Sequence, residues 1–361
     1  MPYDWTKSVF RFMKTLTGRI RGVDRVPFFA IIDEQFISRI IGITTREILS
    51  SPETYANCLI KTAEFIKADT IQIPSAYAGP AEAYAFAEAN NKMNSIQWYD
   101  YKPLAIKQGE VCKTEEDIEK LEIPEHSKID LWDTTYKTAN IIREKTKFPQ
   151  AMGLGIWSVV QELRGINAFK DIRKNPDLLL KLCEKIYESQ LDSYNDWIEK
   201  VGESAIIMYT GYAFNKHMMS FKDAMKYEGQ FIKRFQKKIN SPFFLHNCGT
   251  RPYFREVCNE IDFIAVNGSH PLNIKYWIDF KKDFPKVTIM GANIDVSREL
   301  FTGTPQDVEE KVRENIINLA PGGRYIVSPI CCLPWGVPIP NVLAIPKAIE
   351  KYGQYPIKGA Q

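Results

Sequence analysis

Two short segments of this sequence carry residue types that bind metal ions. His246 and Cys248 are separated by one residue, and Cys331 and Cys332 stand together much later in the chain. An imidazole and thiolates make a borderline-soft set of donors that suits Zn²⁺. Three protein ligands would leave a fourth position open, which is typical of a catalytic zinc. The alternative without a metal is a histidine that hydrogen-bonds at a strand end and cysteines that are small buried hydrophobes.

Both segments follow predicted strands. His246 ends a short apolar run at 243–246, and Cys331 comes just after another run at 325–328. In a barrel of parallel strands, the carboxyl ends of all strands lie at the same rim, where barrel enzymes place their catalytic groups. Residues far apart in the sequence can therefore meet there around one ion, and this coincidence favours the metal over the alternative.

The rest of the chain supplies the elements that such a barrel needs. Short runs rich in Ile, Val, Phe and Tyr are nearly free of charge, as buried parallel strands should be, and they alternate with segments of helical period. The helical segments include 176–200, 221–239 and 305–319. We predict an α/β fold, a single (β/α)₈ TIM barrel over residues 1–361. Its eight strands are predicted at 26–32, 70–74, 151–156, 205–209, 243–246, 263–267, 287–290 and 325–328.

Two segments stand outside this alternation. Residues 3–22 have the pattern of an amphipathic helix, so we expect a helical extension over 1–24 that caps the barrel or packs against a second subunit in a homodimer. Residues 90–149, after the second strand, are expected to be an insertion. Within it, the alternating run 96–111 predicts a hairpin and 114–121 a short helix.

Composition and charge bound the function. The hydrophobic content of 45% is ordinary for a globular protein, and the net charge of +3 comes from Lys and Arg scattered among acids, so nucleic acid is not an expected partner. No run is apolar and long enough for a membrane span, and the first residues lack a signal-peptide core, so we expect a cytoplasmic protein. Seven cysteines without such a leader indicate reduced thiols.

At the metal-binding residues the chain resembles the uroporphyrinogen decarboxylase superfamily, and within it the branch of zinc-dependent, corrinoid-linked methyltransferases. The resemblance runs over nearly the whole chain. The stretches that carry it are 25–27, 161–165, 245–249, 291–295, 303–305, 322–323 and 328–334, with Pro338 and Asn341.

The resemblance implies a zinc held by His246, Cys248 and Cys331. Cys332 stands where the family more often has glycine, and a shift of one residue would give it the role of Cys331. It also implies a corrinoid cofactor, carried by a separate corrinoid-binding protein because this chain has no D-x-H-x-x-G segment of its own.

Two directions of methyl transfer remain open. Zinc could activate the oxygen of a methyl ether that gives its methyl group to cobalt, or it could bind a thiol that accepts the methyl group, as in coenzyme M methylation. The aromatic residues of the rim and the lack of an obvious basic pair for a sulfonate favour the methyl ether.

The decarboxylases differ from this chain at the first strand. Their arginine-rich segment, of the form MRQAGR, is replaced here by residues 31–36 (IIDEQF), which leaves no cradle for a polycarboxylate macrocycle. A metal-free lyase acting on a smaller acid remains an alternative, and so does a barrel that only binds a ligand.

Acidic and histidine side chains at the rim could take part in the chemistry. Asp33 and Glu34 end the first strand and could serve as a fourth zinc ligand, as an acid or base, or as a partner for a substrate hydroxyl; alternatively, they are acids at a helix N-terminus. We assign acid–base chemistry to Glu34 and His270, and substrate binding to Asp33. His126 and His217 are expected to be surface residues.

The remaining candidates are polar and aromatic residues near strand ends. Asp295 could orient His246 through its ring N–H. The residues assigned to substrate binding, besides Asp33, are Tyr209, Tyr212, Asn247, Asn267 and Asn293.

Overall fold

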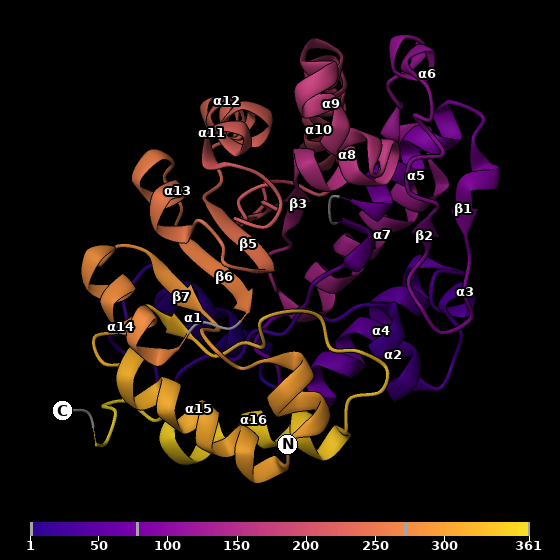
Figure 1. Cartoon of the computed structure of the whole chain (residues 1–361). Coiled ribbons are helices and arrows are strands. Elements are labelled where there is room, and N and C mark those ends of the chain that lie inside the picture. The colour runs from indigo at the N-terminus through magenta and orange to yellow at the C-terminus, as the bar shows by residue number, and fades with distance from the viewer. Residues whose placement is uncertain (1–2, 77–78, 271–272, 360–361) are drawn as a thin grey trace.

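A parallel sheet forms most of a barrel (Figure 1). The computed structural model describes residues 3–76, 79–270 and 273–359. The strand order is β3–β4–β5–β6–β7–β8, with every neighbouring pair parallel. The strands are Met152–Leu154 (β3), Ile207–Thr210 (β4), Phe243–Thr250 (β5), Ala265–His270 (β6), Thr288–Met290 (β7) and Tyr325–Ile326 (β8). The six strands match the last six predicted from the sequence, within a few residues at most ends.

The first two predicted strands form no regular ladder in the structure. In the segment 26–32, the amide of Phe29 donates to the carbonyl of Val327, and the amide of Val327 donates to the carbonyl of Pro27. Pro27 has no N–H with which to extend this pairing. Residues 70–73 have no regular secondary structure, and the amide of Asp69 just before them donates to the carbonyl of Phe28 at 2.8 Å. The two segments occupy the first two strand positions and complete the (β/α)₈ barrel. Its architecture is therefore confirmed, although two of the eight strand positions lack regular strand structure.

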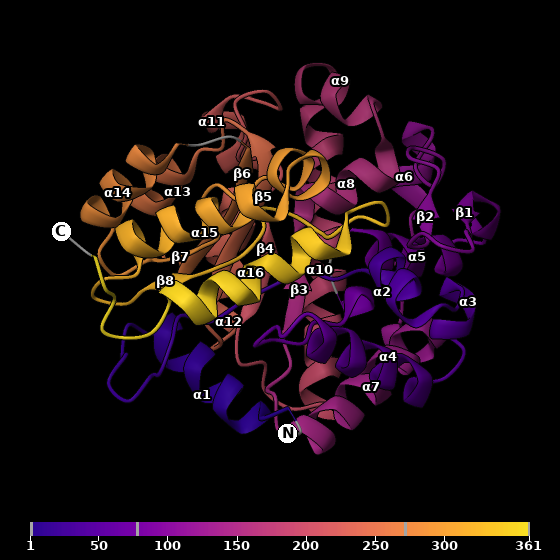
Figure 2. The same ribbon diagram turned by 90° about the horizontal axis from the view of Figure 1, so that it is seen from below.

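Helices surround the sheet on its outer side (Figures 1 and 2). The predicted helix 221–239 is divided by a π-helical turn, η4, at Met225–Gly229. A second such turn, η5, is Val296–Thr302. The α-helices are Trp5–Leu16 (α1), Glu34–Ile41 (α2), Thr45–Ile48 (α3), Pro52–Phe65 (α4), Pro80–Ala89 (α5), Glu115–Lys120 (α6), Asp130–Thr146 (α7), Ile156–Arg164 (α8), Asn167–Lys174 (α9), Pro176–Lys200 (α10), Phe221–Ala224 (α11), Gln230–Lys238 (α12), Phe254–Glu260 (α13), Ile274–Asp283 (α14), Pro305–Leu319 (α15) and Ile339–Tyr352 (α16). Short 3₁₀ turns are Pro74–Ala76 (η1), Met93–Ser95 (η2) and His126–Lys128 (η3).

The N-terminal helix α1 closes one end of the barrel. It lies behind the strands in Figure 1 and at the lower edge of Figure 2. Phe12 and Leu16 on this helix are buried with the inward-facing side chains of the strands. Phe12 stacks on Phe29 with ring centroids 6.3 Å apart. Of the two expected places for this helix, the structure shows the cap. The strand residues in this inner cluster are Phe29, Ile31, Ile206, Met208, Phe244, Ala265, Met290 and Ile326.

The predicted hairpin is present but short. Ile96–Gln97 (β1) pairs antiparallel with Ala105–Ile106 (β2), so the paired strands end before the expected limit at residue 111. Arg164 ties the chain after the hairpin to α8, because its guanidinium donates to the carbonyls of Cys112 and Lys113 at 2.9 Å. At the end of the segment 90–149, α7 packs against α4 in the outer layer of helices.

A cluster of buried ion pairs joins α1 to the segments at the first two strand positions of the barrel. Asp69 has no exposed side-chain surface and pairs with Arg11 and Arg25. It also accepts the amide of Phe28 at 2.8 Å. Arg11 in turn pairs with Asp24 at 2.8 Å. The cluster therefore satisfies the charges that lie between the cap and the barrel.

Removing one partner from this cluster should destabilise the fold strongly. In Asp69→Ala, two guanidinium groups lose their buried counter-charge, and we expect the free energy of unfolding to fall by about 3 kcal/mol or more. Urea denaturation followed by circular dichroism measures this change. The exposed pair Lys67–Glu350 supplies the control, since Lys67→Ala should change stability little. Equal effects of the two substitutions would contradict the expectation.

Among the helices described, each is either too short or too polar to cross a lipid bilayer.

Candidate metal centre

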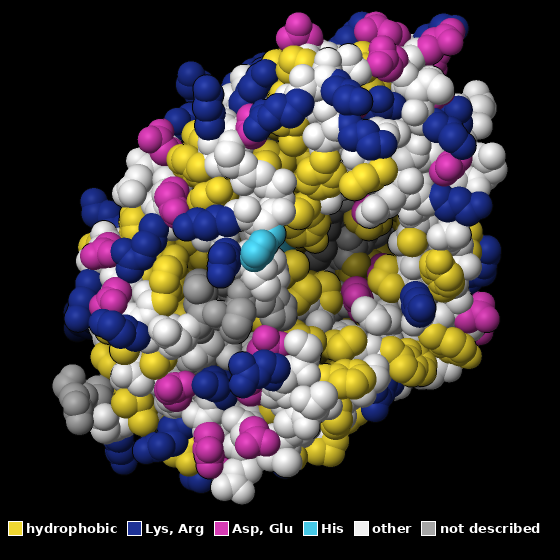
Figure 3. Space-filling view, viewed as in Figure 1, with side chains coloured by type: hydrophobic (Ala, Val, Ile, Leu, Met, Phe, Trp, Pro, Cys, Tyr) yellow, Lys and Arg dark blue, Asp and Glu magenta, His cyan; other side chains and the backbone are white. Residues whose placement is uncertain are grey.

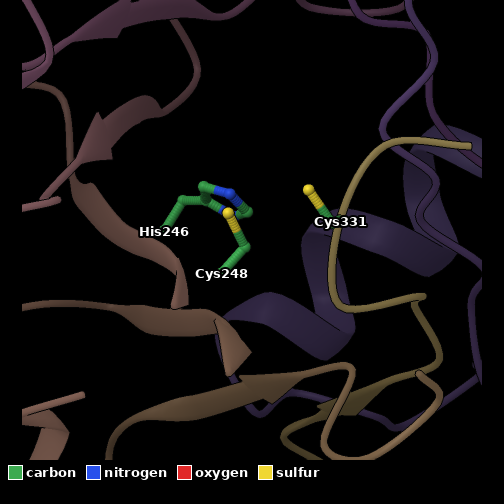
Figure 4. A group of neighbouring side chains, drawn as sticks. All are labelled: His246, Cys248 and Cys331. Atoms are coloured by element: carbon green, nitrogen blue, oxygen red, sulfur yellow. The ribbon is translucent and has the colours of Figure 1, made fainter. Parts of the chain in front are cut away.

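Three side chains converge at the carboxyl end of the barrel. His246 and Cys248 come from β5, and Cys331 comes from the loop after β8 (Figure 4). One donor atom from each lies within 4.8 Å of the other two. Around a tetrahedral zinc with ligands at about 2.0–2.3 Å, donor atoms stand roughly 3.3–3.8 Å apart. The three residues therefore fit a zinc ion after small side-chain movements.

The end of β5 has a local irregularity that positions Cys248. The ladder with β6 pairs Asn247 with Gly268 and next pairs Thr250 with His270, so the strand carries an extra residue between these pairs. Gly268 has a φ of +105°, and a β-carbon there would collide with the carbonyl of Asn247. Glycine at this place allows the close approach of the two strands. The bulge lies at the H-x-C motif.

Asn267 orients the ring of His246. The two residues are paired in register on β5 and β6, and His246 Nδ1 lies 2.6 Å from Asn267 Oδ1. The amide nitrogen of Asn267 donates to the carbonyl of Met290 at 2.8 Å and to Ser328 Oγ at 3.3 Å, which fixes its oxygen toward the ring. Nδ1 must then carry the proton, and the lone pair of Nε2 is left for a metal.

We expected Asp295 to orient His246, but the structure shows Asn267 in this role. Asp295 caps η5 and accepts from the amide of Ser297 at 2.7 Å and from that of Arg298 at 3.2 Å. Asn267, expected to bind substrate, instead faces a proposed ligand.

Loss of this hydrogen bond should weaken metal binding without removing a ligand. We expect Asn267→Leu to lower zinc affinity by roughly 10–100-fold, because the ring of His246 is no longer held in position. Competition with a chromogenic chelator measures the affinity. Asn318→Leu, on the exposed face of α15, is the control and should bind zinc as the parent does. Unchanged affinity in Asn267→Leu would show that the ring is held by other contacts.

The two cysteine thiols have different tendencies to ionise. Hydrogen bonds from Cys248 and Cys332 hold the pKa of Cys331 well below its usual value. Donation of its proton to Cys331, together with burial, raises the pKa of Cys248. Cys331 is thus the thiolate of the group, and a bound metal would add the deprotonation of Cys248. Cys331, rather than Cys332, lies within the group of three donors.

A small pocket opens beside these donors. Its volume is about 230 Å³, below the roughly 300–1,000 Å³ of sites for drug-sized ligands. Figure 3 shows the surface hollowed near the centre of this view, with hydrophobic side chains around the hollow. The lining residues are Ile31, Asp33, Glu34, Leu49, Pro74, Ser75, Pro80, Ala81, Pro103, Leu104, Met208, Thr210, Tyr212, His246, Cys331 and Cys332.

Asp33 and Glu34 line this pocket at the start of α2. Burial raises the pKa of Asp33 to about 6, although the residue also caps α2 by accepting the amide of Phe36. Burial and the neighbouring Asp33 raise the pKa of Glu34 to about 7, and the hydroxyl of Tyr55 donates to it at 3.0 Å. Among the described residues, the group of metal donors does not include either carboxylate. A proton donor or acceptor is the role that their position supports.

Two tyrosines at the end of β4, Tyr209 within the strand and Tyr212 just after it, face different sides of the strand. Tyr212 lines the pocket, and its hydroxyl hydrogen-bonds with Cys248. Tyr209 points the other way, because Met208 and Thr210 of the same strand face the pocket and side chains alternate along a strand. It is fully buried, and its hydroxyl oxygen accepts the amide of Ile156 at 3.2 Å. Tyr209 is therefore a packing residue and not the pocket wall that we expected.

Two asparagines expected to bind substrate do not line the pocket. The amide nitrogen of Asn247 donates to the carbonyls of Gly211 and Phe214, so it joins the end of β5 to the loop after β4. Asn293 has a buried Oδ1 without a hydrogen-bond partner in the described part of the chain. His270 ends β6, but its side chain lies outside the described structure.

Other features were not expected from the sequence. His126 is buried rather than exposed, with Nε2 at 3.0 Å from Glu82. Pro103 and Leu104, near the hairpin, reach the pocket although they are remote from the rim in sequence. Thr210 follows from the alternation of β4, whereas no local pattern marks Pro103 and Leu104 as lining residues.

Comparisons with known proteins agree with this architecture. A comparison with curated proteins found no match. Among solved structures, a methyltransferase from Methanosarcina mazei is similar, with 19% sequence identity, a TM-score of 0.76, and coverage of 96% of this chain and 98% of that chain. At this identity the likeness shows a shared fold. The family model described as uroporphyrinogen decarboxylase (URO-D) matches residues 9–352, and the chain therefore belongs to the uroporphyrinogen decarboxylase family.

Proposed function

We propose that the protein is a zinc-dependent methyltransferase that moves a methyl group between a small methyl ether and the cobalt of a corrinoid protein. The observation that carries the proposal is the group of His246, Cys248 and Cys331 in the wall of a small pocket. Three protein donors leave one metal position for a substrate oxygen. The fold shared with a methyltransferase supports the same reading.

The residues of the pocket have separate tasks in this reaction. A zinc ion bound here would act as a Lewis acid on the ether oxygen. Glu34, when protonated, gives its proton to the oxygen that the methyl group leaves, so that the ether R–O–CH₃ becomes the alcohol R–OH. Asn267 keeps His246 Nε2 aimed at the metal. The apolar walls exclude water from the developing charge.

Aromatic side chains near the mouth support docking of a corrinoid-binding protein there. Tyr101 and Trp335 are 48% and 40% exposed, and their rings lie 5.1 Å apart. They are close in sequence to Leu104 and Cys332, which line the pocket. Exposed aromatic residues beside a site are typical of surfaces that bind another protein.

The alternatives are less well supported by the pocket. None of the described lining residues is lysine or arginine. A decarboxylase would need such a cation for the carboxylate of its substrate, and a methyltransferase that acts on a sulfonate-bearing thiol would need one for the sulfonate. The pocket therefore favours the ether over both alternatives.

The test uses the reduced, zinc-loaded protein with free cob(I)alamin in place of the corrinoid protein. We expect methylcobalamin to form, measured by its absorbance, when 3-methoxybenzyl alcohol or 2-methoxyethanol is the donor. The reverse assay offers methylcobalamin to 2-mercaptoethanesulfonate. Turnover only in the reverse assay would replace the ether with the thiol. A zinc-bound protein inactive in both assays, and also with a corrinoid partner, would support a barrel that only binds a ligand.

A further inference from the structure

The outer part of the pocket wall is apolar and carries no positive charge. It is formed by the residue that follows α3, by the start of α5 and by the hairpin, which are separate from the strand ends that hold the metal donors. Leu104 is 8% exposed and stands just before β2. The apolar residues from these elements are Leu49, Pro80, Ala81, Pro103 and Leu104. A substrate group that reaches this wall meets no described side chain that could balance a negative charge.

The two acids of the pocket also oppose an anionic substrate. Asp33 and Glu34 are both buried in the wall, and a third negative charge beside them would be repelled. Their lone pairs are partly engaged, because Asp33 accepts from Gln35 at 2.7 Å and Glu34 accepts from Tyr55 at 3.0 Å. Burial raises the pKa of Asp33 to about 6 and that of Glu34 to about 7. At neutral pH a carboxyl with a pKa of about 6 is mostly ionised and one with a pKa of about 7 is about half ionised, so the pair carries negative charge that disfavours a bound anion.

We propose that this pocket selects an uncharged methyl ether, with an apolar body and at most hydroxyl groups, over ethers that carry a carboxylate or a sulfonate group. The proposal rests on the proposed methyl-transfer function and names its substrate class. Its physical basis is the cost of burying a charge in a small apolar pocket without a partner. A neutral hydroxyl, by contrast, can hydrogen-bond with the acids or with Thr210.

Binding of three ligands of matched size tests the proposal without any corrinoid. The ligands are 3-methoxybenzyl alcohol, 3-methoxybenzoate and 3-methoxybenzylamine, and isothermal titration calorimetry on the zinc-loaded protein at pH 7 gives their affinities. We expect the alcohol to bind at least roughly 100-fold more tightly than the benzoate, and the amine also to bind more tightly than the benzoate. Binding of the benzoate as tight as that of the alcohol or the amine would overturn the proposal, and so would failure of the alcohol to bind.

A substitution in the apolar wall provides a second test. Leu104→Arg supplies the missing cation, and it should raise the affinity for 3-methoxybenzoate at least tenfold relative to Leu104→Met, which keeps the wall apolar. Circular dichroism confirms that both variants are folded. If folded Leu104→Arg binds the benzoate no better than Leu104→Met, the wall does not set the charge preference.

The methyl-transfer function can fail separately from this proposal. Tight binding of the alcohol without any methylation of cob(I)alamin would contradict the function and leave the charge preference standing. Methylation with a preference for the benzoate would support the function and contradict the charge preference.

Discussion

Cys331→Ser is expected to lose the zinc and the activity while the barrel remains folded. Parent protein purified without chelators should hold about one zinc per chain by elemental analysis, and the variant should hold far less. Serine is nearly isosteric, but its hydroxyl does not replace the thiolate as a zinc ligand. Loss of the metal removes several kcal/mol of transition-state stabilisation. The value of kcat/KM for methylation of cob(I)alamin should therefore fall by about 1,000-fold or more.

The neighbouring cysteine supplies the matched control. Cys332→Ser changes a thiol that also lines the pocket but lies outside the group of three donors, so the variant should keep its zinc. If Cys332→Ser loses the metal and Cys331→Ser keeps it, the second cysteine is the ligand. A folded parent without zinc would remove the metal-dependent mechanism.

Substitutions on β5 separate a catalytic metal from a structural one. His246→Ala and Cys248→Ala should also lose zinc, yet their circular-dichroism spectra should match that of the parent. The barrel core and the α1 cap are built from other residues, such as Phe12, Phe29 and Met208, and do not depend on the rim. Unfolding of either variant would show that the metal holds the fold together.

The meeting of His246, Cys248 and Cys331 at one rim could be predicted from the sequence because two regularities combine. The short apolar runs before His246 and Cys331 predicted strands, and parallel strands in a barrel end at a common rim. The same reasoning placed Asp33 and Glu34 at the rim, and both line the pocket.

The roles of the side chains around these three residues were predicted less well, because they depend on strand register and on loop structure. Whether Tyr209 or Met208 faces inward depends on the register of β4, and a shift of one residue reverses every side chain. Asn267 was expected to bind substrate because it ends a predicted strand at the rim. Its contact with His246 depends on the register of β5 and β6, which the sequence pattern does not define. Pro103 and Leu104 reach the pocket through the folding of a hairpin, which no periodic pattern describes.

Glu34→Gln is expected to abolish the dependence of methyl transfer on a protonated carboxyl group. In the parent, Glu34 must be neutral to donate a proton, so kcat/KM should decrease as the pH rises above its pKa of about 7 in the metal-free protein. A bound divalent cation would lower this pKa, so the decrease should begin at or below pH 7. At acidic pH, kcat/KM of the variant should be at least about 100-fold lower than that of the parent. It should not decrease further as the pH rises across this range. The pH profile of cob(I)alamin methylation measures both effects.

Stability gives a second measure that does not depend on activity. A carboxyl whose pKa is raised on folding contributes stability that is fully present below its unfolded value of 4.5 and is lost as the pH rises toward about 7. Glutamine does not ionise. The difference in melting temperature between Glu34→Gln and the parent should therefore shift in favour of the variant between pH 5 and pH 8.

Two further variants decide whether the pH effect belongs to Glu34. Tyr55→Phe removes the hydroxyl that donates to this carboxyl, which should raise its pKa and move the decrease in kcat/KM to higher pH. Glu228 is equally buried, with its pKa raised to about 8, but it lies outside the pocket and accepts the amides of Trp157 and Ala213. Glu228→Gln should leave the decrease where it is in the parent. A decrease that persists unchanged in Glu34→Gln would mean that another group supplies the proton, and Asp33, whose pKa is raised to about 6 in the same wall, would be the next to substitute.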